Sequence, residues 1–181
     1  MIVTAGPPPA WVTRWMSEAA KSIASPGPSS RSTAVPVTPR LWEHLVHHDP
    51  EARVYEELLR DDHVAVWLIC WMEDHDTGFH DHDTSAGALT VARGRIREER
   101  LGVAGTGIER ELGPGEAIDF AASDIHRVTH AGGGPAVTIN AYSPPLWRMG
   151  AYEVKQSGEL QRHSISYAEE LRPIDGDQVA A

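Results

Sequence analysis

The chain has 181 residues and 41% hydrophobic content, which suits one domain with one sizeable core. Its formal net charge of -10 argues against nucleic acid and membranes as partners, because anionic partners need a basic surface. Cys70 is the only cysteine, and no signal peptide or apolar run of ~20 residues is apparent, so we expect a cytoplasmic protein without an internal disulfide. Sixteen glycines and thirteen prolines against two phenylalanines favour many turns and short strands, and hence a mainly β fold.

Residues 1–37 are rich in proline, serine and glycine, which indicates a flexible N-terminal arm. Within it, "AWVTRWMSEAAKSI" predicts one short helix, which Trp11 and Trp15 dock on the domain because they lie four residues apart on one helical face. A Thr-Pro and an Asp-Pro pair then predict two further helices, over residues 39–48 and 50–60.

Short apolar runs punctuated by glycine and proline follow, and they predict the strands of a β-barrel or sandwich. The runs are "VAVWLICWM", "AGALTVA", "RIREERL", "EAIDFAA", "IHRVTHA", "AVTINAYS", "YEV" and "LQRHSIS". Gly94 and Arg95 suggest a hairpin turn whose second strand alternates Ile96 with exposed charge. We therefore expect a domain over residues 38–174 and a disordered tail over 175–181.

A histidine-rich stretch, "EDHDTGFHDHDTSAG", follows the first predicted strand. Side chains two residues apart on a strand point the same way, so His80 and His82 face one side and the aspartates between and after them face the other. Imidazole is a good ligand for first-row metals, and a third ligand must come from elsewhere in the chain. His126 is the best candidate, since it follows a Pro-Gly turn and begins another predicted strand.

The other histidines are weaker candidates. His44, His47 and His48 share one face of a predicted helix, which we interpret as a solvated face rather than a second metal site. His130 lies on the same strand face as His126. The full set, interpreted mainly as surface or hydrogen-bonding residues, is His44, His47, His48, His63, His75, His130 and His163.

An ordered set of motifs resembles the cysteine dioxygenase family of thiol dioxygenases, within the cupin superfamily. The motifs are "LICW", "HDH", Gly87, the "GR" turn, "IHRV" and "YSPPL", between Tyr55 and Leu146. The resemblance implies a single cupin (jelly-roll) barrel preceded by short helices, with Fe(II) held by His80, His82 and His126. Many cupins add a glutamate ligand shortly after the first two histidines, but Ala86 and Gly87 stand in that region here.

The resemblance also implies a catalytic tyrosine, Tyr142, whose phenol points at the metal-bound reactants. Gly87 excludes the cysteine–tyrosine crosslink of some members. Asn140 stands where the family has a histidine, which removes a proton-relay group. Trp71 and Tyr55 fall at positions of the substrate pocket, although either could simply pack the core.

The family holds the carboxylate of cysteine with an arginine two residues after the tyrosine that Tyr55 matches, and this position is Glu57. A carboxylate there would attract a cation, which favours a cationic or betaine thiol such as ergothioneine. The alternatives are that Arg53 or Arg60 supplies the clamp, or that Arg148 binds a carboxylate from the other side. Glu57 could also be a solvated residue.

The sequence thus predicts an oxidoreductase of sulfur metabolism that uses Fe(II) and O2 to convert a small thiol into a sulfinic acid. One alternative is cysteine or 3-mercaptopropionate as substrate, held by another arginine. Others are a cupin dioxygenase that acts on carbon, and a non-enzymatic cupin that binds a ligand or metal. The sequence indicates no oligomeric state.

Overall fold

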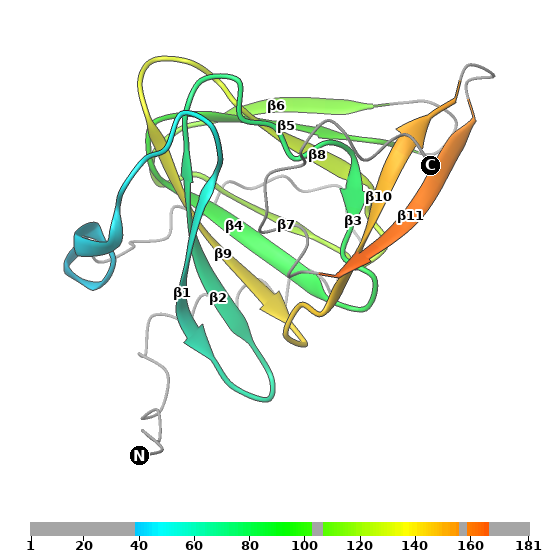
Figure 1. Cartoon of the computed structure of the whole chain (residues 1–181), viewed down its shortest axis with the longest axis horizontal. Helices are drawn as coiled ribbons and strands as arrows, with labels where there is room; N and C mark the ends of the chain where they lie inside the picture. The colour runs from blue at the N-terminus through cyan, green and yellow to red at the C-terminus, as the bar shows by residue number, and fades with distance from the viewer. Residues whose placement is uncertain (1–38, 103–106, 156–158, 167–181) are drawn as a thin grey trace.

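The computed structural model describes residues 39–102, 107–155 and 159–166, and within them nearly all regular structure is β (Figure 1). Two antiparallel sheets are formed. The first has the order β1 (Val54–Arg60), β2 (Ala65–Trp71), β9 (Ala136–Ser143), β4 (Ala86–Arg93) and β7 (Ala117–Phe120). The second has the order β11 (Leu160–Ser166), β10 (Arg148–Val154), β3 (His80–Asp81), β8 (His126–His130), β5 (Ile96–Arg100) and β6 (Ile108–Leu112).

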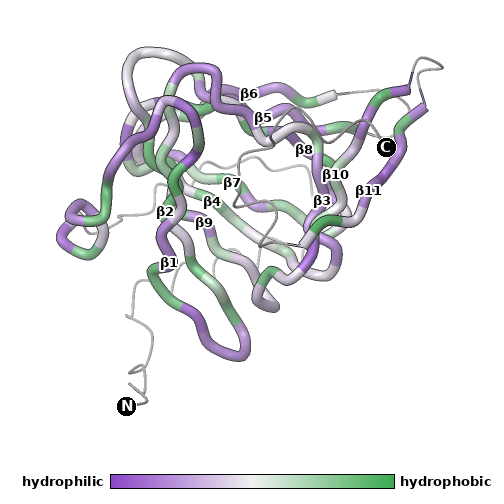
Figure 2. The backbone as a smooth tube through the Cα atoms, viewed as in Figure 1, coloured by the Kyte–Doolittle hydropathy of each residue, from purple (hydrophilic) through white to green (hydrophobic). Residues whose placement is uncertain are grey.

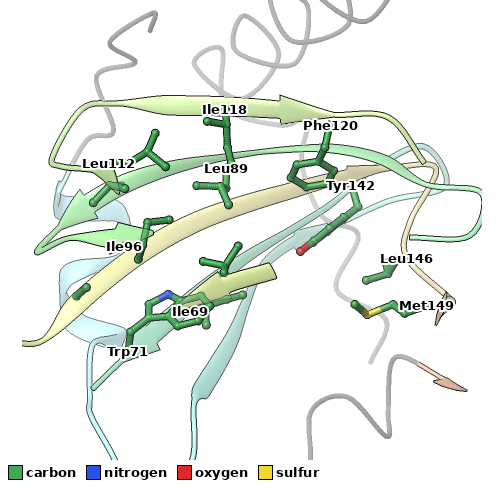
Figure 3. Packing of buried hydrophobic residues seen from close by; sticks show 13 residues of the cluster. Ile69, Trp71, Leu89, Ile96, Leu112, Ile118, Phe120, Tyr142, Leu146 and Met149 are labelled. Carbon is green, nitrogen blue, oxygen red and sulfur yellow. The ribbon is translucent and has the colours of Figure 1, made fainter. Parts of the chain in front are cut away.

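The main core lies between the two sheets. Alternate residues of β2, β4 and β9 point inward and meet apolar residues from the opposite sheet, such as Ile96 and Met149 (Figure 3). Trp71 and Phe120, the largest fully buried side chains in this core, are each at most 2% exposed. Burying one such side chain stabilises the fold by about 1.5–3 kcal/mol.

The outer face of the first sheet carries a second apolar cluster. Outward residues of β2, β4 and β9 pack there with Trp42, which lies between the short 3-10 turns η1 (Pro39–Leu41) and η2 (Glu43–Leu45). Because this sheet is covered on both faces, the run "AVWLICW" of β2 is apolar almost throughout. Figure 2 shows the contrast with β6, which is largely hydrophilic.

Two of the expected helices are absent from this structure. The helix predicted over 50–60 was wrong, because residues 54–60 form β1, which pairs with β2 from Val54↔Cys70 to Arg60↔Ala65. Pairing along a neighbouring strand and burial of Leu58 and Leu59 against the outer cluster outweigh the helical propensity of this segment. The helix predicted over 39–48 is reduced to η1 and η2.

Gly94 joins the two sheets instead of making the predicted hairpin, since β4 and β5 belong to different sheets. The glycine has a φ of +70°, and a Cβ atom there would lie 2.6 Å from the Cα of Ala136. Both observations explain why glycine is needed at this crossing.

The predicted strands from β2 onward are confirmed, and β9 matches its run "AVTINAYS" residue for residue. β6 was not predicted, because only its two end residues are apolar. The predicted arm with Trp11 and Trp15 and the tail over 175–181 lie outside the described residues. Among the described residues, no helix is long and apolar enough to cross a membrane.

Candidate metal centre

Three histidines converge on the inner face of the second sheet. His80 of β3 is in register with His126, the first residue of β8, and His82 follows β3 directly. Their ring centroids are 4.6 to 5.1 Å apart, and the nitrogens available as ligands all lie within 4.8 Å of one another. Each residue is at most 5% exposed. The structure therefore brings together the three residues that the sequence nominated as ligands.

The hydrogen bonds of two of these rings fix which nitrogen carries the proton. The Nδ1 of His80 lies 3.0 Å from the carbonyl oxygen of Gly78, and the Nδ1 of His126 lies 3.0 Å from the Oε1 of Glu98. A carbonyl and an ionised carboxylate only accept, so both Nδ1 atoms donate and each Nε2 keeps its lone pair. This arrangement orients imidazole ligands in metal sites.

Two buried nitrogens at this centre lack a hydrogen-bond partner within the part of the chain that the structure describes: Nε2 of His126 and Nδ1 of His82. Buried polar atoms are normally paired, so orphaned atoms at a convergence of imidazoles need an explanation. A metal ion coordinated by the three rings would supply it. The residues therefore fit a metal, and the site could bind one.

The electrostatic environment keeps the rings of His80 and His82 neutral. Burial, together with the neighbouring His126, lowers the pKa of His80 to about 3. Burial and the two neighbouring imidazoles hold the pKa of His82 well below its ordinary value. Both rings are therefore unprotonated at neutral pH and available as ligands.

An aromatic wall borders the centre on the side of the first sheet. Phe120 stacks on His82 with ring centroids 4.5 Å apart, and the ring of Tyr142 lies 5.2 Å from that of His82. Figure 3 shows Phe120 and Tyr142 side by side on the inner face. Gly87 is in register with Tyr142, and a Cβ atom there would lie 2.6 Å from Cζ of Phe120. Phe120 thus occupies the space that any side chain at position 87 would need.

A buried hydrogen-bonded chain of three side chains lies farther along the same inner face. Nε1 of Trp71 donates to Oγ1 of Thr138 at 3.0 Å, and Nδ2 of Asn140 donates to the same oxygen at 2.8 Å. All three residues are at most 3% exposed. Asn140 and Trp71 are therefore linked through the hydroxyl of Thr138.

Comparison with known proteins decides the family. The model of the cysteine dioxygenase type I family matches residues 32–155, which include the three histidines, Phe120 and Tyr142. The chain belongs to this family. It is thus related to oxidoreductases of the dioxygenase type. A search of curated proteins gave no match.

Solved structures support the cupin fold of this family member. A protein from Bacillus halodurans, BH2720, has a TM-score of 0.51 at 21% identity and covers 76% of this chain and 92% of its own. The protein TT1209 from Thermus thermophilus has a TM-score of 0.51 at 18% identity, over 57% of this chain and 93% of its own. An uncharacterised Klebsiella pneumoniae protein with a double-stranded β-helix domain reaches 0.50 at 16% identity, over 56% and 80%.

The residues expected to bind substrate in this dioxygenase-like chain are only partly brought together. Tyr55 and Trp71 both belong to the core between the sheets, and the guanidinium of Arg53 lies 5.5 and 5.6 Å from their ring centroids. Arg53 is also close enough to contribute to the lowered pKa of His80, after burial and His126. Arg148 is exposed and alternates on β10 with Met149, whose side chain is in the core, so its side chain faces away from the histidines.

Glu57 lies on the inner side of the edge strand β1, in register with Trp67, but it is already paired. Nε of Arg60 donates to its Oε2 at 2.6 Å, and the guanidinium of Arg60 lies over the ring of Trp67. The carboxylate therefore carries little uncompensated charge. This ion pair removes the reason for expecting a cationic thiol.

Two residues of the centre, Phe120 and Glu98, were not predicted from the sequence. The strand with Glu98 was expected to show only charge to solvent, whereas Glu98 is 0% exposed. Alternation offered the signal: Glu98 is two residues from the buried Ile96 and shares its face. The weaker candidates His75 and His130 hydrogen-bond to backbone groups instead.

Proposed function

We propose that the protein is a non-haem iron(II) thiol dioxygenase that adds both atoms of O2 to the sulfur of a small thiol. The observation that carries this is a buried group of three imidazoles, to which no carboxylate of the described residues belongs: His80, His82 and His126. The reaction balances without a co-reactant, because one thiol and one O2 contain all the atoms of one sulfinic acid. Sulfur is oxidised, both oxygens become bonded to it, and the thiol proton is kept in the acid.

Iron(II) held by His80, His82 and His126 would lower the pKa of a bound thiol and supply the redox chemistry with O2. The chain supplies the surroundings. Phe120 and Gly87 close one side against water, and Tyr142 presents a phenol on the same inner face. A positioned phenol can donate a hydrogen bond to an oxygen that gains charge during the reaction.

The charges around the centre favour a thiol that carries a carboxylate, such as 3-mercaptopropionate or cysteine, over the cationic thiol first expected. Arg53 lies over Tyr55 and Trp71, near His80, whereas Glu57 is neutralised by Arg60. A guanidinium binds a carboxylate with two parallel hydrogen bonds. Arg53 is therefore the proposed clamp, two residues before Tyr55 on the same side of the chain.

Oxygen uptake by the iron-loaded protein tests this function. The thiols are 3-mercaptopropionate, cysteine, cysteamine and ergothioneine, and the variants are Arg53→Gln and Glu57→Gln, with exposed Arg40→Gln as the control. We expect Arg53→Gln to lower kcat/KM about 10-fold or more for the carboxylate thiols only. Failure of all four thiols to drive uptake would contradict the proposal. Turnover of a carbon substrate instead, or iron binding without turnover, would favour the other cupin functions.

A further inference from the structure

We infer that Glu98 is a positioning residue of the metal centre: it imposes one tautomer on His126 and places a negative charge behind that ligand. The inference rests on the three-histidine site of the proposed function. It concerns a carboxylate on β5 that is remote from the substrate side, and its test does not depend on turnover.

The carboxylate of Glu98 is buried and fully engaged. Oε1 accepts from Nδ1 of His126 at 3.0 Å and from Nη2 of Arg100 at 2.8 Å, while Oε2 accepts from Nε of Arg110 at 2.6 Å. The two arginine side chains are 19% and 29% exposed, whereas Glu98 is 0% exposed. A buried carboxylate is tolerated only with such partners, so these hydrogen bonds and ion pairs stabilise the ionised form of Glu98.

Three elements hold this carboxylate in place. β5 carries Glu98 and Arg100, and β6 carries Arg110, which is in register with Glu98. Arg100 also donates to Oδ2 of Asp124 at 2.9 Å and to the carbonyl of Asp119 at 2.8 Å, so it ties the group to the connection that leads from β7 to His126. The position of His126 is thus fixed both along its strand and through its ring.

The charges of this group sum to zero, with two arginines against Glu98 and Asp124. Loss of the Glu98 charge would leave one net positive charge beside a bound cation. It would also allow His126 to adopt either tautomer, because a glutamine can either accept from Nδ1–H or donate to an unprotonated Nδ1. Both effects weaken a metal centre, and loss of such outer partners typically lowers metal affinity 10–100-fold.

The test compares wild type, Glu98→Gln and Glu99→Gln. Glu99 is the neighbour on β5 that faces the other way and pairs with half-buried Arg127 at 3.6 Å, so its replacement removes the same charge outside the centre. Cobalt(II) affinity is measured by competition with a chelator, and the proton position on His126 by nitrogen-15 NMR of the metal-free protein.

We expect wild-type His126 to carry its proton on Nδ1 alone. Glu98→Gln should give a mixture of tautomers and about 10–100-fold weaker cobalt(II) binding, with Glu99→Gln like wild type. A wild-type protein with the proton on Nε2 would overturn the inference without any variant. So would equal affinity in wild type and Glu98→Gln. If wild type itself bound no metal, the proposed function would fail instead.

Discussion

At the scale of single residues, Tyr142 is the side chain whose chemistry can be separated from metal binding. Its ring lies 5.2 Å from that of His82, and its phenol is separate from the three imidazoles of the proposed metal site. We predict that Tyr142→Phe lowers kcat about 100-fold, because a hydrogen-bond donor to the reacting oxygen is lost, and leaves iron affinity unchanged. Steady-state oxygen uptake and chelator competition measure the two quantities. Equal loss of kcat and of bound iron would show that the tyrosine is structural.

Gly87 offers a packing test at the same scale. A Cβ atom there would meet the ring of Phe120 and lie 2.9 Å from the carbonyl oxygen of Ala141. Gly87→Ala should therefore lower the free energy of unfolding by about 1–3 kcal/mol, as overpacking does. Combined with Phe120→Leu, it should cost less than the sum of the two single changes, measured by urea denaturation. Strict additivity would mean that the two sites do not compete for space.

Some residues of the centre could be predicted from the sequence and others could not, because only some of them carry a local signal. His80, His82 and His126 could be nominated because ligand chemistry and the two-residue alternation of strands are local. Glu98 was overlooked because a charged residue was expected to face solvent, although it shares the strand face of the buried Ile96. The pairing of Glu57 with Arg60 depends on a β-bulge between Glu57 and Leu59, which a periodic pattern does not predict.

At the scale of elements, an ion pair fastens the edge strand β11 to β3. Arg162 donates to both oxygens of Asp81 at 2.7 and 2.8 Å, and the hydroxyl of Tyr152 donates to Oδ2 at 2.6 Å. Burial would raise the pKa of Asp81, but the hydrogen bonds from Arg162 and Tyr152 outweigh it and hold the pKa well below its usual range. The contribution to stability is therefore present at neutral pH and is lost as acid protonates Asp81.

We predict that Arg162→Met lowers the free energy of unfolding by about 1–2 kcal/mol at pH 7, a value reduced by the partial exposure of Arg162. The difference from wild type should shrink below about pH 4, where the unfolded carboxyl group binds its proton. Urea denaturation at both pH values measures it. Arg97→Met is the control, because the pair of Arg97 with Glu109 is exposed and should contribute less than about 1 kcal/mol. An equally large difference in the free energy of unfolding between wild type and Arg162→Met in acid would contradict the assigned role of Asp81.

The strands of the barrel were easier to predict than its edges. Central strands such as β2 are buried on both sides, so a plain apolar run between turn residues marks them. β1 and β6 are edge strands with mixed polarity, and only their neighbours define them. The sheet to which β5 belongs was also predicted wrongly. A glycine turn has the same sequence pattern whether it joins two strands of one sheet or of two sheets.

At the scale of the whole molecule, a metal bound by the three histidines should stabilise the folded state. His80 and His126 belong to the second sheet, and the ring of His82 packs against Phe120 of the first. A ligand that binds only the folded state stabilises it by mass action. We predict that cobalt(II) raises the Tm of wild type by several degrees, with the rise following concentration, and leaves His126→Ala unchanged. A similar rise in His126→Ala would place the metal elsewhere.

Isotopically labelled oxygen tests the proposed dioxygenase reaction most directly. The iron-loaded protein is given the thiol that drives the fastest oxygen uptake, under 18O2, and the product is analysed by mass spectrometry. We expect a sulfinic acid with both oxygens labelled and one O2 consumed per thiol. A disulfide without label, or a label on carbon, would contradict it.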